Sequence, residues 1–142
     1  MDGVMTRNRI IILASFVLIF TTTLFPFNFT LRGSVLSWRV LALAPGIEGK
    51  GEILANILLY LPLGLAITVY FCSRRMQIHR ILILVLVICF TISYFCEVLQ
   101  FFLPSRFPSW RDVASNTMGG ILGSLCVFVW AQKVSRSSCL TN

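Results

Sequence analysis

The residues of this chain that could do chemistry gather between two apolar runs. Glu97, Gln100 and Asn116 lie inside or at the ends of apolar segments, whereas charge elsewhere sits mostly just outside such segments. Charged and amide side chains are costly in those surroundings and often mark a functional site. Glu97 could act as a general base, and the two amides could supply neutral hydrogen bonds.

Three further charged residues lie in the polar segment between those runs. Arg106 and Arg111 could bind a phosphate or a carboxylate, because the planar guanidinium donates parallel hydrogen bonds to such groups. Asp112 is a second candidate general base. The sequence shows no Gly-x-Ser-x-Gly, no Cys-x-x-Cys and no metal-ligand cluster. We therefore expect no metal and no cofactor, and whether the two carboxylates catalyse a reaction stays open.

The composition indicates an integral membrane protein. Hydrophobic residues make up 57% of the 142 residues and charged residues only 12%, against roughly 25% charged residues in a soluble domain. The net charge of +7 is carried largely by short segments beside apolar runs. That placement is typical of membrane topology and contact with anionic lipid, so we expect no nucleic-acid partner.

Four apolar segments predict an all-α fold, a four-helix transmembrane bundle that forms a single domain over residues 1–142. Basic residues precede the first segment, fill the short connection between the second and the third, and follow the fourth. The positive-inside rule therefore predicts that both termini are cytoplasmic. The expected spans are residues 10–27, 53–72, 81–103 and 113–132.

Helix geometry predicts that the polar residues of three spans lie at similar depths. Glu97 is about 25 Å along the third span, near the outer boundary of a core roughly 30 Å thick. Asn116 follows Asp112 by four residues, or about 6 Å of helix, and Asn56 is similarly close to the start of the second span. We therefore expect a shallow site under the outer surface, with the polar loop residues above it.

Glycines of the fourth span are expected to position Asn116 within this site. Gly119 and Gly123 have the Gly-x-x-x-Gly spacing that lets a neighbouring helix approach closely. Gly120 and Asn116 lie on the same broad face. Close packing along that face would bring Asn116 towards its partners on another helix.

A purely structural interpretation of the same residues remains open. Glu97 could pair with Arg106 or Arg111, because a charge within hydrocarbon needs a partner wherever it occurs. Gln100 and Asn116 would then be ordinary hydrogen-bonding residues between helices.

A set of polar, proline and glycine positions from residue 56 to residue 123 covers about half of the chain. These positions are Asn56-x5-Pro62-x-Gly64, Glu97-x-x-Gln100, Arg106 and Asp112-x-x-x-Asn116-x-x-Gly119 with Gly123. The pattern resembles the VanZ-like family of bacterial membrane proteins. Other branches of that family carry an Asp-Lys-x-x-His motif at the start of the second span. The corresponding residues here are Glu52-Ile53-Leu54-Ala55-Asn56, so no role of that histidine is carried over.

The resemblance implies a multi-pass protein of the bacterial cytoplasmic membrane. The named member of the family is associated with low-level resistance to the glycopeptide teicoplanin. Carried over by position, the functional residues are Glu97, Gln100, Arg106, Asp112 and Asn116.

Three functions fit these observations. In the first, the protein binds or modifies a cell-envelope component, and the two arginines engage a membrane-lipid headgroup or an envelope precursor. Asn56, Gln100 and Asn116 would complete that binding site. In the second, an intramembrane enzyme uses Glu97 or Asp112 in acid–base chemistry. In the third, the protein is an accessory subunit that forms a homo-oligomer or joins an envelope complex.

Overall fold

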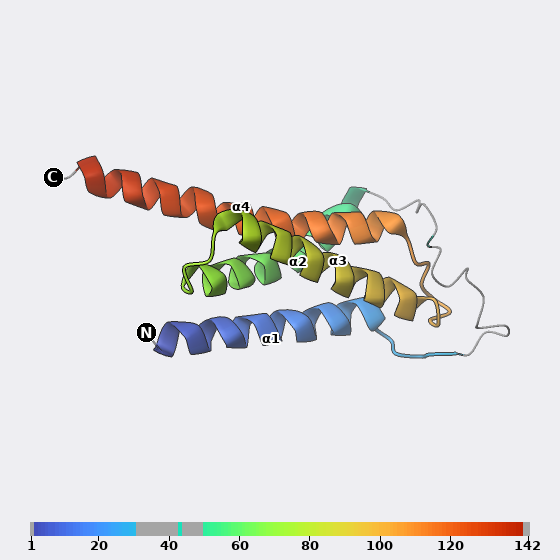
Figure 1. Cartoon of the computed structure of the whole chain (residues 1–142). Coiled ribbons are helices and arrows are strands. Elements are labelled where there is room, and N and C mark those ends of the chain that lie inside the picture. The colour runs from blue at the N-terminus through green and yellow to red at the C-terminus, as the bar shows by residue number, and fades with distance from the viewer. Residues whose placement is uncertain (1, 31–42, 44–49, 141–142) are drawn as a thin grey trace.

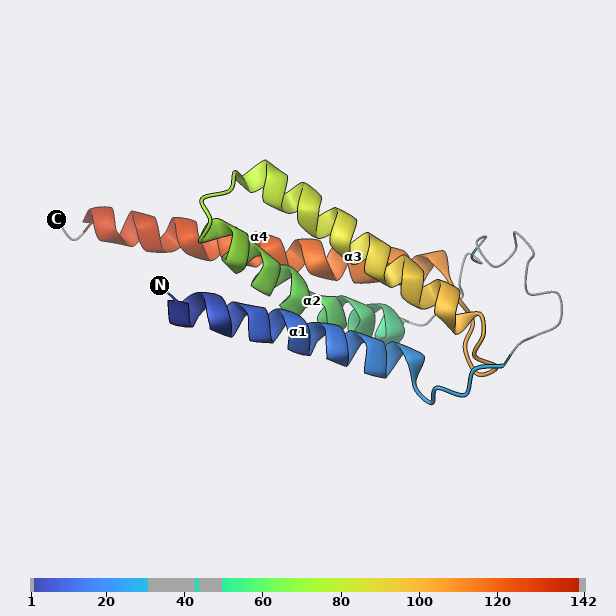
Figure 2. The same cartoon turned by 60° about the horizontal axis from the view of Figure 1, so that its bottom comes forward.

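The computed structural model describes residues 2–30, 43 and 50–140 of the chain, and the side-chain surroundings of residues 6–30, 43 and 51–133. The described residues form four α-helices: α1 Asp2–Leu24, α2 Lys50–Cys72, α3 Ile78–Gln100 and α4 Trp110–Leu140. The helices pack along one another in an elongated bundle, with both termini at the same end (Figures 1 and 2). We call the opposite end, which carries the connection between α3 and α4, the distal end.

All four helices are long and apolar enough to cross a membrane, which confirms the predicted four-helix membrane fold. The candidate spans are Thr6–Leu24, Gly51–Cys72, Ile78–Gln100 and Trp110–Lys133. Three helices are longer than the predicted spans, since α1 begins at Asp2, α2 begins at Lys50 and α4 continues to Leu140. Apolar length marks only the part of a helix inside the membrane, and backbone hydrogen bonding continues beyond it. The third helix has the predicted length but lies three residues earlier, at Ile78–Gln100, and Pro104 disfavours a helical conformation at the residue before it.

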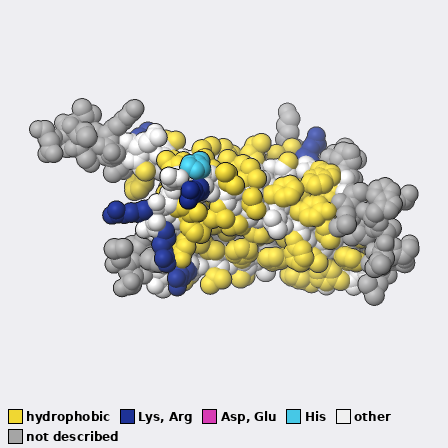
Figure 3. Space-filling view, in the orientation of Figure 1, with side chains coloured by type: hydrophobic (Ala, Val, Ile, Leu, Met, Phe, Trp, Pro, Cys, Tyr) yellow, Lys and Arg dark blue, Asp and Glu magenta, His cyan; other side chains and the backbone are white. Residues whose placement is uncertain are grey.

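The surface of the bundle is apolar in its middle and basic towards the end that carries the termini (Figure 3). Large side chains such as Leu58, Ile83 and Val129 are more than half exposed. A soluble protein would bury such side chains, whereas a membrane protein places them against lipid. The basic end includes the connection between α2 and α3, where Arg74, Arg75 and Arg80 are all exposed.

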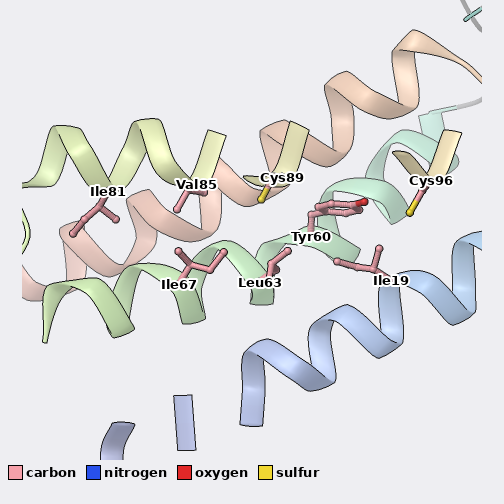
Figure 4. Packing of buried hydrophobic residues seen from close by; sticks show 8 residues of the cluster. All are labelled: Ile19, Tyr60, Leu63, Ile67, Ile81, Val85, Cys89 and Cys96. Atoms are coloured by element: carbon pink, nitrogen blue, oxygen red, sulfur yellow. The ribbon is translucent and has the colours of Figure 1, made fainter. Parts of the chain in front are cut away.

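A narrow apolar core lies between the helices (Figure 4). It draws side chains from α1, α2 and α3, and partly buried residues of all four helices pack against it. The fully or almost fully buried members are Ile19, Tyr60, Leu63, Ile67, Ile81, Val85, Cys89 and Cys96.

The most extensive contact is between α2 and α4, which run in the same direction. In two side-chain hydrogen bonds between these helices, the bonded residues differ by 56 in sequence number. One close contact between glycines has the same offset, so the two helices lie in a single parallel register. The opposing pairs are Asn56 with Asp112, Gly64 with Gly120, and Thr68 with Ser124.

Glycine makes this close approach of α2 and α4 possible. A Cβ atom added at Gly64 would overlap the carbonyl group of Gly120, and one added at Gly119 or Gly123 would overlap the backbone of α2. The prediction that Gly119 and Gly123 admit a neighbouring helix is therefore confirmed, and that neighbour is α2. The contact fixes α4, and with it Asn116, against α2 and beside α3.

Candidate functional site

The start of α4 brings together four polar residues from three helices, which we call the carboxylate cluster. Ser109 directly precedes α4 and caps it, since its Oγ accepts a hydrogen bond from the Asp112 amide at 3.1 Å. The Ser109 amide donates to Glu97 Oε2 at the end of α3, over 2.8 Å. Asp112 Oδ1 accepts from Asn56 Nδ2 of α2 at 2.6 Å. These hydrogen bonds link α2, α3 and α4 at the distal end.

The two carboxylates of the cluster differ in accessibility. Glu97 is only 2% exposed, and its Oε2 is directed at a backbone amide at the start of α4, where the helix dipole favours a negative charge. Asp112 lies in the first turn of α4 and is half-buried. A ligand arriving from the distal end would therefore reach Asp112 more easily than Glu97, and Glu97 is suited to holding the start of α4 in place.

Two predicted site residues form hydrogen bonds between helices. Gln100 Nε2 donates to the Thr23 carbonyl of α1 at 3.1 Å, and Asn116 Nδ2 donates to Ser93 Oγ of α3 at 2.9 Å. These bonds are the ones that the structural interpretation expects. Asn116 lies one turn below Asp112 on α4, so it forms a deeper polar layer than the carboxylate cluster.

Arg106 and Arg111 lie at the distal end and are both exposed. Arg106 donates hydrogen bonds to the Thr22 carbonyl at 3.2 Å and the Phe25 carbonyl at 3.5 Å. A cation at the C-terminus of α1 is favourable, because the last carbonyl groups of a helix carry partial negative charge. Arg106 therefore fastens α1 to the α3–α4 connection, while a guanidinium retains further N–H groups that can bind a ligand.

An apolar groove of about 270 Å³ lies between α3 and α4 beside the cluster. Phe90 forms its α3 side, and Trp110, Ala114 and Met118 lie along its α4 side. The rings of Phe90 and Trp110 are stacked with their centroids 6.3 Å apart. The groove begins at the distal end and continues for about three turns of α4.

The structure adds three polar residues that the sequence analysis did not select: Ser109, Ser93 and Tyr60. Ser109 begins the pattern Ser-x-x-Asp with Asp112, a recognised signature of a helix start. Ser93 precedes Glu97 by four residues and Tyr60 follows Asn56 by four, so helix periodicity could have assigned both to the polar faces. Among the described residues, no group of three or more His, Cys, Asp or Glu residues lies close enough to hold a metal ion.

Four membrane-spanning helices around a buried polar cluster define a multi-pass membrane protein. A model of the VanZ/LLP1 family matches residues 5–131, which is most of the chain. The chain therefore belongs to the VanZ/LLP1 family, which confirms the resemblance seen in its sequence. No curated protein and no solved structure matches it.

Proposed function

We propose that this protein binds an anionic lipid or lipid-linked envelope component at its distal end. The observation that carries the proposal is an apolar groove lined by Trp110, directly before the exposed Arg111, with a second exposed arginine, Arg106, at the same end of the bundle. Guanidinium groups suit phosphate and carboxylate, and an apolar groove suits a hydrocarbon chain. A ligand that has both parts satisfies both features.

The geometry of α4 aligns the cationic and apolar parts of this site. Arg111 precedes Ala114 by three residues and Met118 by seven, so all three lie on one face of the helix. Trp110 adjoins them, and tryptophan favours the boundary between lipid headgroups and hydrocarbon. A lipid chain lying in the groove would place its headgroup beside Arg111.

The carboxylate cluster acts in this proposal by positioning the site. Ser109 and Glu97 determine where α4 begins, and Asn56 holds Asp112 against α2. The cluster therefore fixes the two residues Trp110 and Arg111, which lie within the α4 segment that it holds.

The proposal places the distal end at the outer leaflet of a bacterial cytoplasmic membrane. The exposed arginines near the termini and in the α2–α3 connection support cytoplasmic termini by the positive-inside rule. The shared end of the two termini in Figure 1 is consistent with that orientation.

Fluorescence quenching of Trp110 by brominated lipids tests the proposal. The chain has three tryptophans, so Trp38→Phe with Trp130→Phe leaves Trp110 as the reporter. We expect acyl-brominated phosphatidylglycerol to quench Trp110 at a mole fraction about fivefold lower than brominated phosphatidylcholine requires, given the attraction of one arginine to anionic lipid. Arg106→Ala combined with Arg111→Ala should abolish this preference.

Matched variants distinguish lipid binding at the distal end from a general effect of the protein's positive charge. Arg74→Ala with Arg80→Ala removes two exposed arginines near the other end and should leave the preference intact. Arg111→Ala alone should weaken the preference while leaving the Arg106 bonds to α1 in place. Equal quenching by both lipids in the parent protein, or an unchanged preference in the Arg106/Arg111 variant, would contradict the proposal.

An enzyme and an accessory subunit are the competing functions. For an enzyme, Glu97→Gln and Asp112→Asn should each change the envelope lipid composition while the protein stays folded. For a subunit, a partner or a second copy of the chain should co-purify in stoichiometric amount in mild detergent. The burial of Glu97 favours positioning over acid–base chemistry at that residue.

The family resemblance makes teicoplanin susceptibility the phenotype to measure first. If the proposed site underlies resistance, expression of the protein in a susceptible bacterium raises the inhibitory concentration of teicoplanin. The Arg106→Ala, Arg111→Ala variant should then lose that effect at equal expression.

A further inference from the structure

The shared register of α2 and α4 sets Tyr60 opposite Asn116. Opposing residues of the two helices differ by 56 above and below this level, and Tyr60 and Asn116 differ by the same number. Tyr60 is 0% exposed and Asn116 is 2% exposed. The two side chains therefore form a layer between the hydrogen-bonded pair Asn56–Asp112 and the glycine contact below it.

Each of these two side chains has a polar atom with no hydrogen-bond partner among the described residues. The atoms are the Tyr60 hydroxyl and Asn116 Oδ1. Figure 4 shows the Tyr60 hydroxyl pointing along the bundle towards Cys96, away from Leu63. Buried polar atoms nearly always have a partner, and within a membrane the cost of lacking one is higher than in a soluble protein.

Ser93, on α3, interacts with both of these side chains. Its Oγ accepts the hydrogen bond from Asn116 Nδ2 at 2.9 Å, and it also neighbours the Tyr60 hydroxyl. A hydroxyl oxygen has two lone pairs, so Ser93 Oγ can accept a second hydrogen bond. Three helices thus supply one donor, the Tyr60 hydroxyl, and two acceptors, Asn116 Oδ1 and Ser93 Oγ.

We propose that a water molecule is bound between Tyr60, Ser93 and Asn116, as a structural part of the bundle. The water accepts the Tyr60 hydroxyl proton in a hydrogen bond and donates to Asn116 Oδ1 and Ser93 Oγ. Three hydrogen bonds are typical of a buried water, and the arrangement satisfies both unpaired atoms. This site lies one layer below the carboxylate cluster and does not depend on the proposed lipid ligand.

Tyr60→Phe tests whether the hydroxyl has a buried hydrogen-bond partner, because a bonded and an unbonded hydroxyl predict opposite signs. If the water binds the hydroxyl, its removal should lower the folding equilibrium constant about fivefold, as the loss of one buried hydrogen bond does. If the hydroxyl has no partner, Phe should raise the constant or leave it unchanged, and that result would overturn the proposal. Reversible unfolding in mixed micelles measures the constant.

A double-mutant cycle links the effect to Asn116. In an Asn116→Leu background, Tyr60→Phe should change the folding constant by less than about twofold. The matched control is Tyr60→Phe combined with Thr68→Val, two turns below, where the two effects should multiply independently. Independent effects of Tyr60 and Asn116 would overturn the proposal.

Nuclear magnetic resonance of the parent protein distinguishes a water from a direct bond. Magnetisation should transfer from a slowly exchanging water to the Asn116 side-chain amide, and Tyr60→Phe should remove that transfer. Absence of transfer in the parent protein would overturn the water site even if Tyr60 and Asn116 are coupled, since a direct bond would then join them.

Discussion

Glu97 differs from the other polar residues of the bundle because it accepts a hydrogen bond from the backbone amide of Ser109, the residue directly before the next helix. The carboxylate is 2% exposed, and Ser109, which donates to it, is 1% exposed. A buried amide without an acceptor costs about 1–3 kcal/mol, and a buried charge without a donor costs more. The two groups therefore stabilise each other, and Ser109 in turn caps α4 through its hydroxyl.

Substitution of Glu97 should separate its hydrogen-bonding role from its charge. Glu97→Ala leaves the Ser109 amide without its acceptor and should lower the free energy of unfolding by about 1–3 kcal/mol. Glu97→Gln keeps an acceptor oxygen and should cost less. Denaturant unfolding of the purified variants in detergent measures both, and an equal loss in the two variants would show that charge, not the acceptor, is required.

Among the contacts between helices, the pairing of α2 with α4 is the one that positions the site. Glycines bring the two backbones into contact, and the shared register carries Asn56 to Asp112 at one level and Thr68 to Ser124 at another. The remaining helices attach to this pair. Of these, α3 contributes Glu97 and Ser93, and α1 is held at the distal end by Gln100 and Arg106.

Glycine-to-alanine substitutions should show how much of the fold depends on this contact. Gly119→Ala would place a Cβ against the α2 backbone and should lower the free energy of unfolding by about 1–3 kcal/mol, as overpacking does. Gly51→Ala is the matched control in α2, since nothing lies within 4 Å of its added Cβ. That control should be neutral or stabilising by up to about 1 kcal/mol. Thermal unfolding in detergent compares the two, and equal stabilities would contradict the close contact.

The sequence predicted the helices and their glycine contact better than it predicted the polar pairs. Apolar length and Gly-x-x-x-Gly spacing are local signals, and both were sufficient for α2 and α4. The partner of a polar residue depends on the register between helices, which sequence spacing within one helix does not contain. Asn56 therefore could not be assigned to Asp112, nor Asn116 to Ser93, before the helices were placed against one another.

The whole molecule has two chemically different ends joined by an apolar belt. One end carries both termini and exposed arginines of the α2–α3 connection (Figures 1 and 3). The distal end carries the carboxylate cluster, the groove and two further exposed arginines. The direction in which these ends face decides which leaflet the proposed site meets.

Cysteine labelling in intact cells should establish that direction. In a background with the five native cysteines replaced by serine, Ser105→Cys introduces an exposed thiol at the distal end and Gln77→Cys one in the α2–α3 connection. We expect a membrane-impermeant maleimide to label residue 105 directly and residue 77 only after permeabilisation. The reverse pattern would put the distal end in the cytoplasm and contradict the proposed outer-leaflet site.

The backbone contact between α2 and α4 also limits how the bundle can move. Gly64 and Gly120 meet without side chains that could rotate to make room, so the two helices can separate only as whole elements. The distal end of α1 is fastened through the carbonyl groups of Thr22 and Thr23. Lateral opening of the bundle towards lipid would therefore require α1 to pivot about its distal end, or α3 to slide along a rigid α2–α4 unit.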